Sequence, residues 1–169
     1  MKRLFVLLLI TALCSPLLGC AKETAHIQEP VSFYYRRKTL AYGEENSVIL
    51  SENRESVGHQ NSPEYLLKEY LAGPISDNLA RTFPPRTTLV QLTVDNSKAT
   101  IILSSHIANL TGMDLTIACA CLTLTTMELT GAETVEIRAK DALLDDAESI
   151  IMDRECLLFL DDSATKPAE

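Results

Sequence analysis

The chain of 169 residues has no tryptophan, only four phenylalanines and five tyrosines, so aromatic stacking cannot be its main binding device. Positive charge is scarce as well: 15 Lys and Arg stand against 23 Asp and Glu, which gives a formal net charge of −8. Because nucleic-acid binding depends on Lys and Arg that neutralise phosphate groups, this balance argues against a nucleic-acid partner. The length suits one domain, and an apolar fraction of 46% is too high for a disordered chain.

The sequence also lacks the usual motifs of catalysis and metal binding. His26, His59 and His106 are scattered, and neither a His-x-x-x-His nor a Cys-x-x-Cys pair occurs. Ser105 and His106 are adjacent, and neighbouring strand residues point to opposite faces, which disfavours a nucleophile–base pair. The acidic run 141–148 has no EF-hand spacing, which favours a solvated acidic face over a calcium site. We therefore expect no enzymatic activity, no metal site and no cofactor.

What the sequence does contain is an export signal. Lys2 and Arg3 precede an apolar run that is shorter than the roughly 20 residues of a membrane span. The following Leu17-Leu18-Gly19-Cys20 resembles a bacterial lipobox, which implies a signal peptide over 1–19 and a lipidated Cys20. Several acyl chains on one residue give stable anchoring, so the protein is expected on the outer face of the cytoplasmic membrane. The alternative is ordinary signal cleavage that leaves Cys20 as a free thiol.

Three cysteines remain beyond Cys14 and Cys20: Cys119, Cys121 and Cys156. An odd number allows no complete set of disulfides. Cys119 and Cys121 are two apart in a helical pattern and point to opposite sides, so they do not readily share a metal or a bond. We expect buried, apolar thiols.

Hydrophobic periodicity in the first half of the domain predicts two strands and a helix. Apolar and polar residues alternate over 31–36, a second short strand covers 48–50, and a polar loop follows over 52–62. Ser62-Pro63-Glu64 combines a hydroxyl N-cap, a proline at the first helical position and an acid in the first turn. The helix ends at Gly73-Pro74, where we expect a left-handed glycine cap.

The second half predicts a hairpin, a longer helix and a final strand. Strands over 88–94 and 99–103 flank the turn Asp95-Asn96-Ser97-Lys98, a helix runs to Leu129 before Gly131, and a strand covers 134–140. Residues 150–151 suit a further short strand. The order ββαββαβ indicates an α+β fold, a mostly antiparallel sheet with two helices on one face.

This arrangement resembles the GerMN domain of bacterial sporulation and spore-germination lipoproteins. The resemblance rests on the Tyr34-Tyr35 strand, the helix that stops at Leu71-Ala72-Gly73-Pro74, the hairpin at Asp95, the apolar helix 113–129 and the strand over 135–137. It implies an extracytoplasmic, non-catalytic module that acts through protein interaction or assembly. The expected organisation is a linker over 20–30, one GerMN-like domain over 31–160 and a flexible tail over 161–169.

Two surfaces are candidates for binding. Ile117, Cys121 and Leu124 form a second apolar stripe on the longer helix, which either docks an envelope or sporulation protein or another copy, or is covered by the acidic C-terminal segment. The basic cluster Arg36, Arg37 and Lys38 is either a charged strand edge or, in an alternative function, a contact for peptidoglycan or another glycan.

Overall fold

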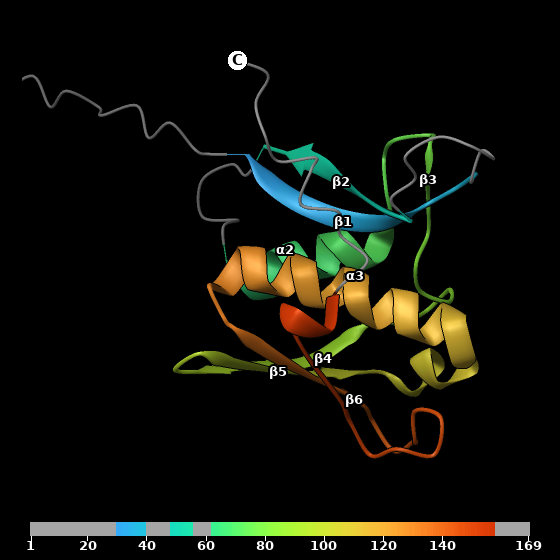
Figure 1. Cartoon of the computed structure of the whole chain (residues 1–169), viewed down its shortest axis with the longest axis vertical. Coiled ribbons are helices and arrows are strands. Elements are labelled where there is room, and N and C mark those ends of the chain that lie inside the picture. Colours follow the sequence, from blue (N-terminus) through green and yellow to red (C-terminus); the bar gives the residue numbers. More distant parts are fainter. Residues whose placement is uncertain (1–29, 40–47, 56–61, 158–169) are drawn as a thin grey trace, which may run out of the picture.

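The computed structural model describes residues 30–39, 48–55 and 62–157, which form two β-sheets with helices between them. One sheet has three strands in the order β2-β1-β3, and the other has four in the order β4-β5-β6-β7. Figure 1 shows the smaller sheet on one side of the helices α2 and α3 and strands of the larger sheet on the other. Each sheet therefore has the helices on one face.

In the smaller sheet, β1 (Val31–Arg37) pairs antiparallel with β2 (Ile49–Arg54) over six residue pairs, from Val31 with Arg54 to Arg36 with Ile49. The short β3 (Leu79–Ala80) joins the other edge of β1. The predicted β1 is confirmed. The predicted polar loop over 52–62 is wrong at its start, because the second strand continues to Arg54 along the whole of β1.

The larger sheet contains the predicted hairpin of β4 (Leu89–Asp95) and β5 (Lys98–Leu103), whose turn has Asn96 at φ 52°. The hairpin is followed by the short 3₁₀ helix η2 (Ser105–Asn109). The strand β6 (Thr134–Ala139) runs parallel to β5, and β7 (Ile150–Asp153) lies antiparallel to β6. Another 3₁₀ helix, η3 (Glu155–Leu157), closes the described chain. Inward residues of β5 and β6, among them Ile101, Leu103 and Ile137, are fully buried.

The helix α2 (Pro63–Ala72) begins as predicted, with the Ser62 hydroxyl accepting a hydrogen bond from the Tyr65 N–H at 3.2 Å. Its end differs from the expected left-handed cap. Gly73 has φ 109° and ψ 172°, so φ is positive but the backbone is extended. Its N–H still bonds to the Tyr70 carbonyl at 3.0 Å, and the chain leaves the helix straight into Pro74.

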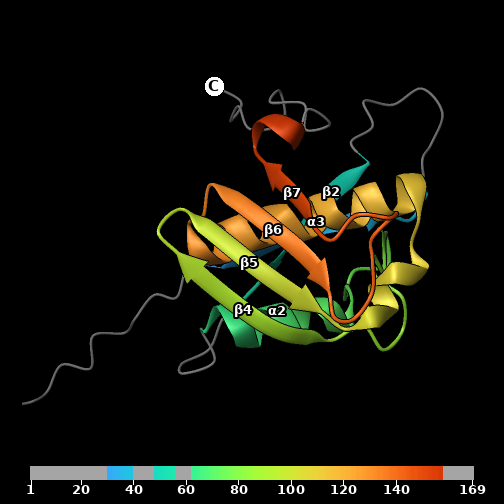
Figure 2. The same cartoon turned by 90° about the horizontal axis from the view of Figure 1, so that it is seen from below.

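The helix α3 (Gly112–Thr130) runs through the centre of the molecule, between the two sheets (Figures 1 and 2). All residues from Ala118 to Met127 are buried. Among the described helices, α3 has the length and apolar composition of a membrane span, but most of it is buried inside the fold, as expected of a core helix. The α+β class and the predicted order of the longer elements are confirmed; the division into two sheets is what the sequence did not reveal.

Candidate functional site

The predicted lipidation residue, Cys20, lies outside the described residues. So do residues 20–29 of the expected linker, the last residues 158–160 of the expected domain and the expected tail over 161–169. Lipidation of Cys20 stays a prediction. The candidates within the described residues are the helical stripe, the basic cluster and the polar groups that the fold brings together.

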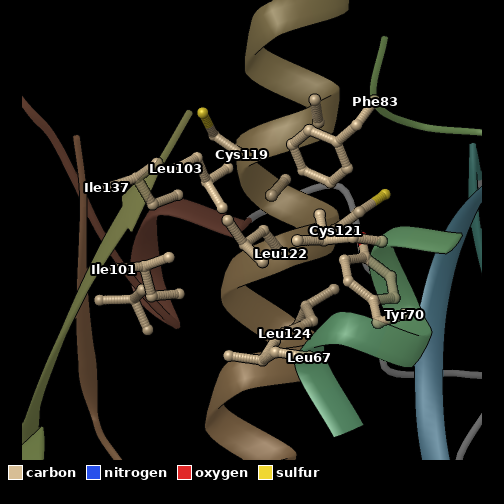
Figure 3. Packing of buried hydrophobic residues seen from close by; sticks show 14 of the residues in the cluster. Leu67, Tyr70, Phe83, Ile101, Leu103, Cys119, Cys121, Leu122, Leu124 and Ile137 are labelled. Carbon is tan, nitrogen blue, oxygen red and sulfur yellow. The ribbon is translucent and has the colours of Figure 1, made fainter. Parts of the chain in front are cut away.

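The proposed partner stripe on α3 belongs to the core. Cys121 is fully buried and Leu124 is 6% exposed, while Ile117 is partly buried against the same cluster. Figure 3 shows Cys121 near Tyr70 and Leu124 near Leu67, both of which belong to α2. The stripe is therefore not a partner surface as the fold stands, because α2 and the smaller sheet cover the face of α3 that the larger sheet leaves free.

Two of the three cysteines beyond Cys20 are also buried in the core. Cys119 and Cys121 are buried on different sides of α3, and burial raises the pKa of each thiol to about 12. Both thiols remain protonated and unreactive at neutral pH. Cys156 is exposed, which corrects the expectation that all three are buried; the buried residue of η3 is its neighbour Leu157.

The residues of the basic cluster make different contacts. Arg36 donates to the Asp114 carboxylate at 2.6 Å, which joins the end of β1 to the first turn of α3. The backbone N–H of Lys38 bonds to the Asn78 carbonyl at 2.9 Å, while its side chain is exposed. At least one charge of the cluster, which also contains Arg37, is therefore already matched by a carboxylate. Both side chains of the Arg36–Asp114 ion pair are more than two-fifths exposed, so it contributes little to stability.

A polar cluster in β2 holds the turn after α2. The Glu52 carboxylate accepts hydrogen bonds from the backbone N–H groups of Ile75 at 2.9 Å and Ser76 at 2.7 Å. It also pairs with Arg54 at 2.7 Å, and Arg54 in turn donates to the Gly73 carbonyl at 2.7 Å. Two side chains of β2, Glu52 and Arg54, thus stabilise the chain where α2 ends, at the Gly73-Pro74 position predicted from sequence.

Aromatic rings and a second arginine surround this cluster. The Arg54 guanidinium lies 4.9 Å from the centre of the Phe33 ring, a cation–π distance. The Tyr35 hydroxyl donates to the Tyr70 carbonyl at 2.9 Å, and Arg81 donates to the Ala72 carbonyl at 2.5 Å. The last turn of α2 has no basic residue of its own, so Arg54 and Arg81 supply positive charge to its carbonyl end from other elements.

Glu52 is 7% exposed, and burial alone would raise its pKa. The hydrogen bonds from Ser76, Arg54 and Ile75 together outweigh burial, so the pKa of the Glu52 carboxyl lies below its usual value. A carboxylate held in this way has no free lone pairs directed at a substrate. The cluster is structural in kind, a lock between β2 and α2.

The Ser104 hydroxyl and the His106 ring nitrogen Nδ1 are 3.3 Å apart, the one hydroxyl–imidazole contact within the described ranges. The same hydroxyl accepts from the Thr88 N–H at 3.1 Å and lies 3.3 Å from the Arg86 carbonyl. In residues 30–39, 48–55 and 62–157, no carboxylate orients the imidazole as in a catalytic triad. This arrangement ties η2 to the start of β4.

The acidic run 141–148 has a structural role that the sequence did not reveal. The Asp145 carboxylate accepts a hydrogen bond from the Gly112 N–H at 2.8 Å, at the N-terminus of α3. The side chain of the α3 N-cap residue, Thr111, makes no capping hydrogen bond, and the Asp145 carboxylate takes that role. Its negative charge also interacts favourably with the positive N-terminal end of the helix dipole. No group of three or more potential metal ligands occurs among the described residues.

The outer face of the larger sheet carries one charge network. Glu136 pairs with Lys98 at 2.6 Å and with Arg138 at 2.5 Å, and only 7% of its side chain is exposed. Hydrogen bonds from Lys98 and Arg138 lower the pKa of Glu136. Figure 2 shows this sheet on the outside of the molecule, with α3 behind it. The network therefore sets two cations against one carboxylate.

Solved structures of other proteins share this architecture. The fold is similar to the first GerMN domain of the sporulation protein GerM from Bacillus subtilis, with a TM-score of 0.56 and 16% identity over 73% of this chain and 94% of that one. The tandem GerMN domains of the same protein give a TM-score of 0.50 and 16% identity, over 66% of this chain and 39% of that one. No curated protein sequence matches the chain.

At such identities the structural similarity shows the fold alone. The sequence adds a family match: residues 32–145, more than half of the chain, match the family Germane, described as sporulation and spore germination. The match begins in β1 and ends in the acidic run that caps α3, so it takes in both helices and strands of both sheets. The chain belongs to the Germane family of sporulation and spore-germination proteins, and it contains a GerMN domain.

Proposed function

We propose that this protein is a lipoprotein anchored at the outer face of the cytoplasmic membrane, where its GerMN domain acts as a non-catalytic interaction or assembly module in sporulation or spore germination. The observation that carries the anchoring is the sequence Leu17-Leu18-Gly19-Cys20 behind a positively charged start and a short apolar run. The family match supports the process.

Two polar groups that resemble catalytic groups serve the fold instead. The buried carboxylate of Glu52 is fully used in holding a turn, and the Ser104–His106 contact has no orienting acid among the described residues. The alternative, recognition of peptidoglycan or another anionic glycan by residues 36–38, has less support, because Arg36 is already paired with Asp114.

Metabolic labelling with a fatty-acid analogue tests the anchoring. The full chain is expressed in a bacterium that processes lipoproteins, together with Cys20→Ser and with Cys156→Ser as a control. We expect label and membrane association in the wild type and in the control, because Cys156 is exposed but has no lipobox before it. Cys20→Ser should lose the label and leave the membrane fraction. Equal labelling of wild type and Cys20→Ser would overturn the proposal.

The glycan alternative is separated by a binding assay of the same full chain on purified peptidoglycan. The interaction role predicts no retention. Retention that is abolished by Lys38→Glu, and unchanged by Lys68→Glu on α2, would replace the proposed role by glycan binding. Both lysines are exposed in the described residues, which makes them a matched pair.

A further inference from the structure

The strand β4 is an edge strand of the larger sheet, and α2 lies beside it (Figure 2). Its one neighbour in the sheet is β5, and Figure 2 shows no strand beyond it among the described residues. The side chains of Val90 and Val94 are 47% and 44% exposed. Charged side chains and proline are two of the usual means by which proteins protect an edge strand from pairing. The segment Leu89–Val94 contains neither.

The hydrogen-bond pattern shows which backbone groups face outward. The Leu103 carbonyl accepts from Lys140 on the β6 side, while the Ser104 N–H bonds to the Thr88 carbonyl on the β4 side. Because successive residues alternate in an antiparallel ladder, Ile101 and Ala99 also direct their groups away from β4. Their partners in β4, Leu92 and Val94, therefore direct N–H and C=O groups to the edge of the sheet.

The edge is complementary to itself. If two β4 strands pair antiparallel about Thr93, then Leu92 faces Val94 of the second copy and Thr93 faces Thr93. Asp95, the one charged residue of the strand, faces the neutral Gln91. Apolar residues meet apolar ones on one face, Thr and Gln meet polar ones on the other, and no like charges are opposed.

The irregularity at Val90 sets the length of this match. The register of β4 on β5 shifts between Leu89 and Gln91, so Val90 is an extra residue and bends the strand. The regular segment is Gln91–Asp95, five residues with its centre at Thr93. Within these five residues, Leu92 and Val94 direct their backbone N–H and C=O groups to the edge. Antiparallel pairing places Leu92 of one copy opposite Val94 of the other.

We propose that the domain associates with a second copy of itself through antiparallel pairing of β4, which joins the two larger sheets into one. This inference rests on the proposed role as an interaction module and names one partner for it. The net negative charge of the chain opposes association, but the paired segment holds little of that charge, and salt screens charges more than about 10 Å apart. Because only five residues of each copy pair, we expect a weak dimer in dilute solution. Anchoring at a membrane raises the local concentration of the copies and so favours the dimer.

Cysteine cross-linking in the full, membrane-associated chain tests the pairing. The background carries Cys156→Ser, because that thiol is exposed. Thr93 lies at the centre of the match as a non-hydrogen-bonded pair, where Cα atoms are about 4.5 Å apart, within disulfide reach. Thr93→Cys should give a disulfide-linked dimer under mild oxidation. Thr100→Cys is the control, since Thr100 pairs with Thr93 inside the chain, one strand from the edge.

A second pair of variants acts on the interface itself. Val94→Lys, added to Thr93→Cys, should reduce the dimer several-fold, because it places a charge opposite Leu92 of the other copy. Val90→Lys, equally exposed but outside the regular segment, should leave the dimer unchanged. A wild-type melting temperature of each variant shows that the fold is kept.

The proposal is overturned if Thr93→Cys gives no dimer, if Thr100→Cys gives as much, or if Val94→Lys and Val90→Lys behave alike. The fatty-acid label on the same samples keeps the two proposals apart. Labelled protein without a dimer contradicts the pairing and leaves anchoring intact, whereas a dimer without label contradicts anchoring alone.

Discussion

At the scale of single residues, two glycines end the two helices in different backbone conformations. Gly131, after α3, has φ 69° and ψ 10°, the left-handed form that other residues adopt at a cost of roughly 1 kcal/mol. Gly73, after α2, has φ 109° and ψ 172°, a region used almost only by glycine. A Cβ at Gly73 would also lie 3.4 Å from the Arg81 side chain, whereas nothing lies within 4 Å at Gly131.

We expect Gly73→Ala to lower the free energy of unfolding by about 2–3 kcal/mol, since it forces a side chain into that conformation. Gly131→Ala should cost about 1 kcal/mol. Urea unfolding followed by circular dichroism measures both. Equal losses for the two variants would show that the backbone at Gly73 relaxes to an ordinary left-handed cap.

Glu52 illustrates how one buried carboxylate can organise a turn. Glu52→Gln replaces one acceptor oxygen by an NH₂ group, which must then face either Arg54 or the N–H groups of residues 75 and 76, all of them donors. We expect a loss of about 1.5–3 kcal/mol in unfolding free energy at neutral pH, the range for hydrogen bonds to a charged group. Glu55→Gln, one residue beyond the end of β2 and exposed, is the control.

The same carboxyl predicts a pH dependence. Its pKa is lowered in the folded state, so its contribution is present above the pKa of the unfolded chain, near the ordinary value of 4.5. The contribution is lost as the pH falls through the lower folded value. The difference in melting temperature between wild type and Glu52→Gln should therefore shrink as the pH falls below about 4.5. A melting-temperature difference that stays constant as the pH falls well below 4.5 would contradict a lowered pKa of Glu52 in the folded state.

At the scale of elements, α3 explains why a helix can be rich in threonine and still be a core helix. The hydroxyls of Thr126 and Thr130 bond to the carbonyls four residues before them, at 2.7 Å each. The Thr125 hydroxyl instead accepts the Tyr34 N–H of β1 at 3.0 Å. The short β3 pairs only with Arg36 and Arg37 at the end of β1, and the Thr125 side chain provides an acceptor for the backbone of β1 at Tyr34. This hydrogen bond connects α3 to the smaller sheet.

Two isosteric substitutions on α3 should have opposite results. Thr125→Val keeps the shape but leaves the Tyr34 N–H without its acceptor, which costs about 1–3 kcal/mol of unfolding free energy. Thr123→Val should be neutral or stabilising, because the Thr123 hydroxyl is buried without a hydrogen-bond partner. Chemical denaturation of both variants checks the contrast. A larger loss for Thr123→Val than for Thr125→Val would refute this account.

At the scale of the whole molecule, the fold is a sandwich in which the two sheets enclose the helices. Leu124 lies on the side of α3 that faces α2, at 6% exposure, while Met113 in the first turn is 67% exposed. Leu124→Asp buries an unpaired charge and should cost several kcal/mol, enough to unfold a marginal domain. Met113→Asp should leave the melting temperature nearly unchanged. A folded Leu124→Asp protein with native near-ultraviolet circular dichroism would contradict the buried position.

Some of this architecture follows from local rules that a sequence displays. The Ser62-Pro63-Glu64 start of α2, the Asp95–Lys98 turn and the alternation in β1 and β6 each depend on residues close together in the chain, and each is found where it was predicted. The α+β class follows from the order of those elements. The lipobox is likewise local, which is why Cys20 can be proposed from sequence alone.

Other features depend on which distant segments meet, and only the tertiary structure decided them. Periodicity shows that α3 is apolar all round, but not whether α2, a sheet or a partner covers its second stripe, because burial depends on neighbours brought together by the fold. Glu52 and Arg54 resemble loop residues in sequence, yet they lock a turn more than 18 residues away. Asp145 caps a helix that begins 33 residues earlier. The energies of these polar contacts arise from exclusion of water, which exists only once the two sheets have closed over the helices.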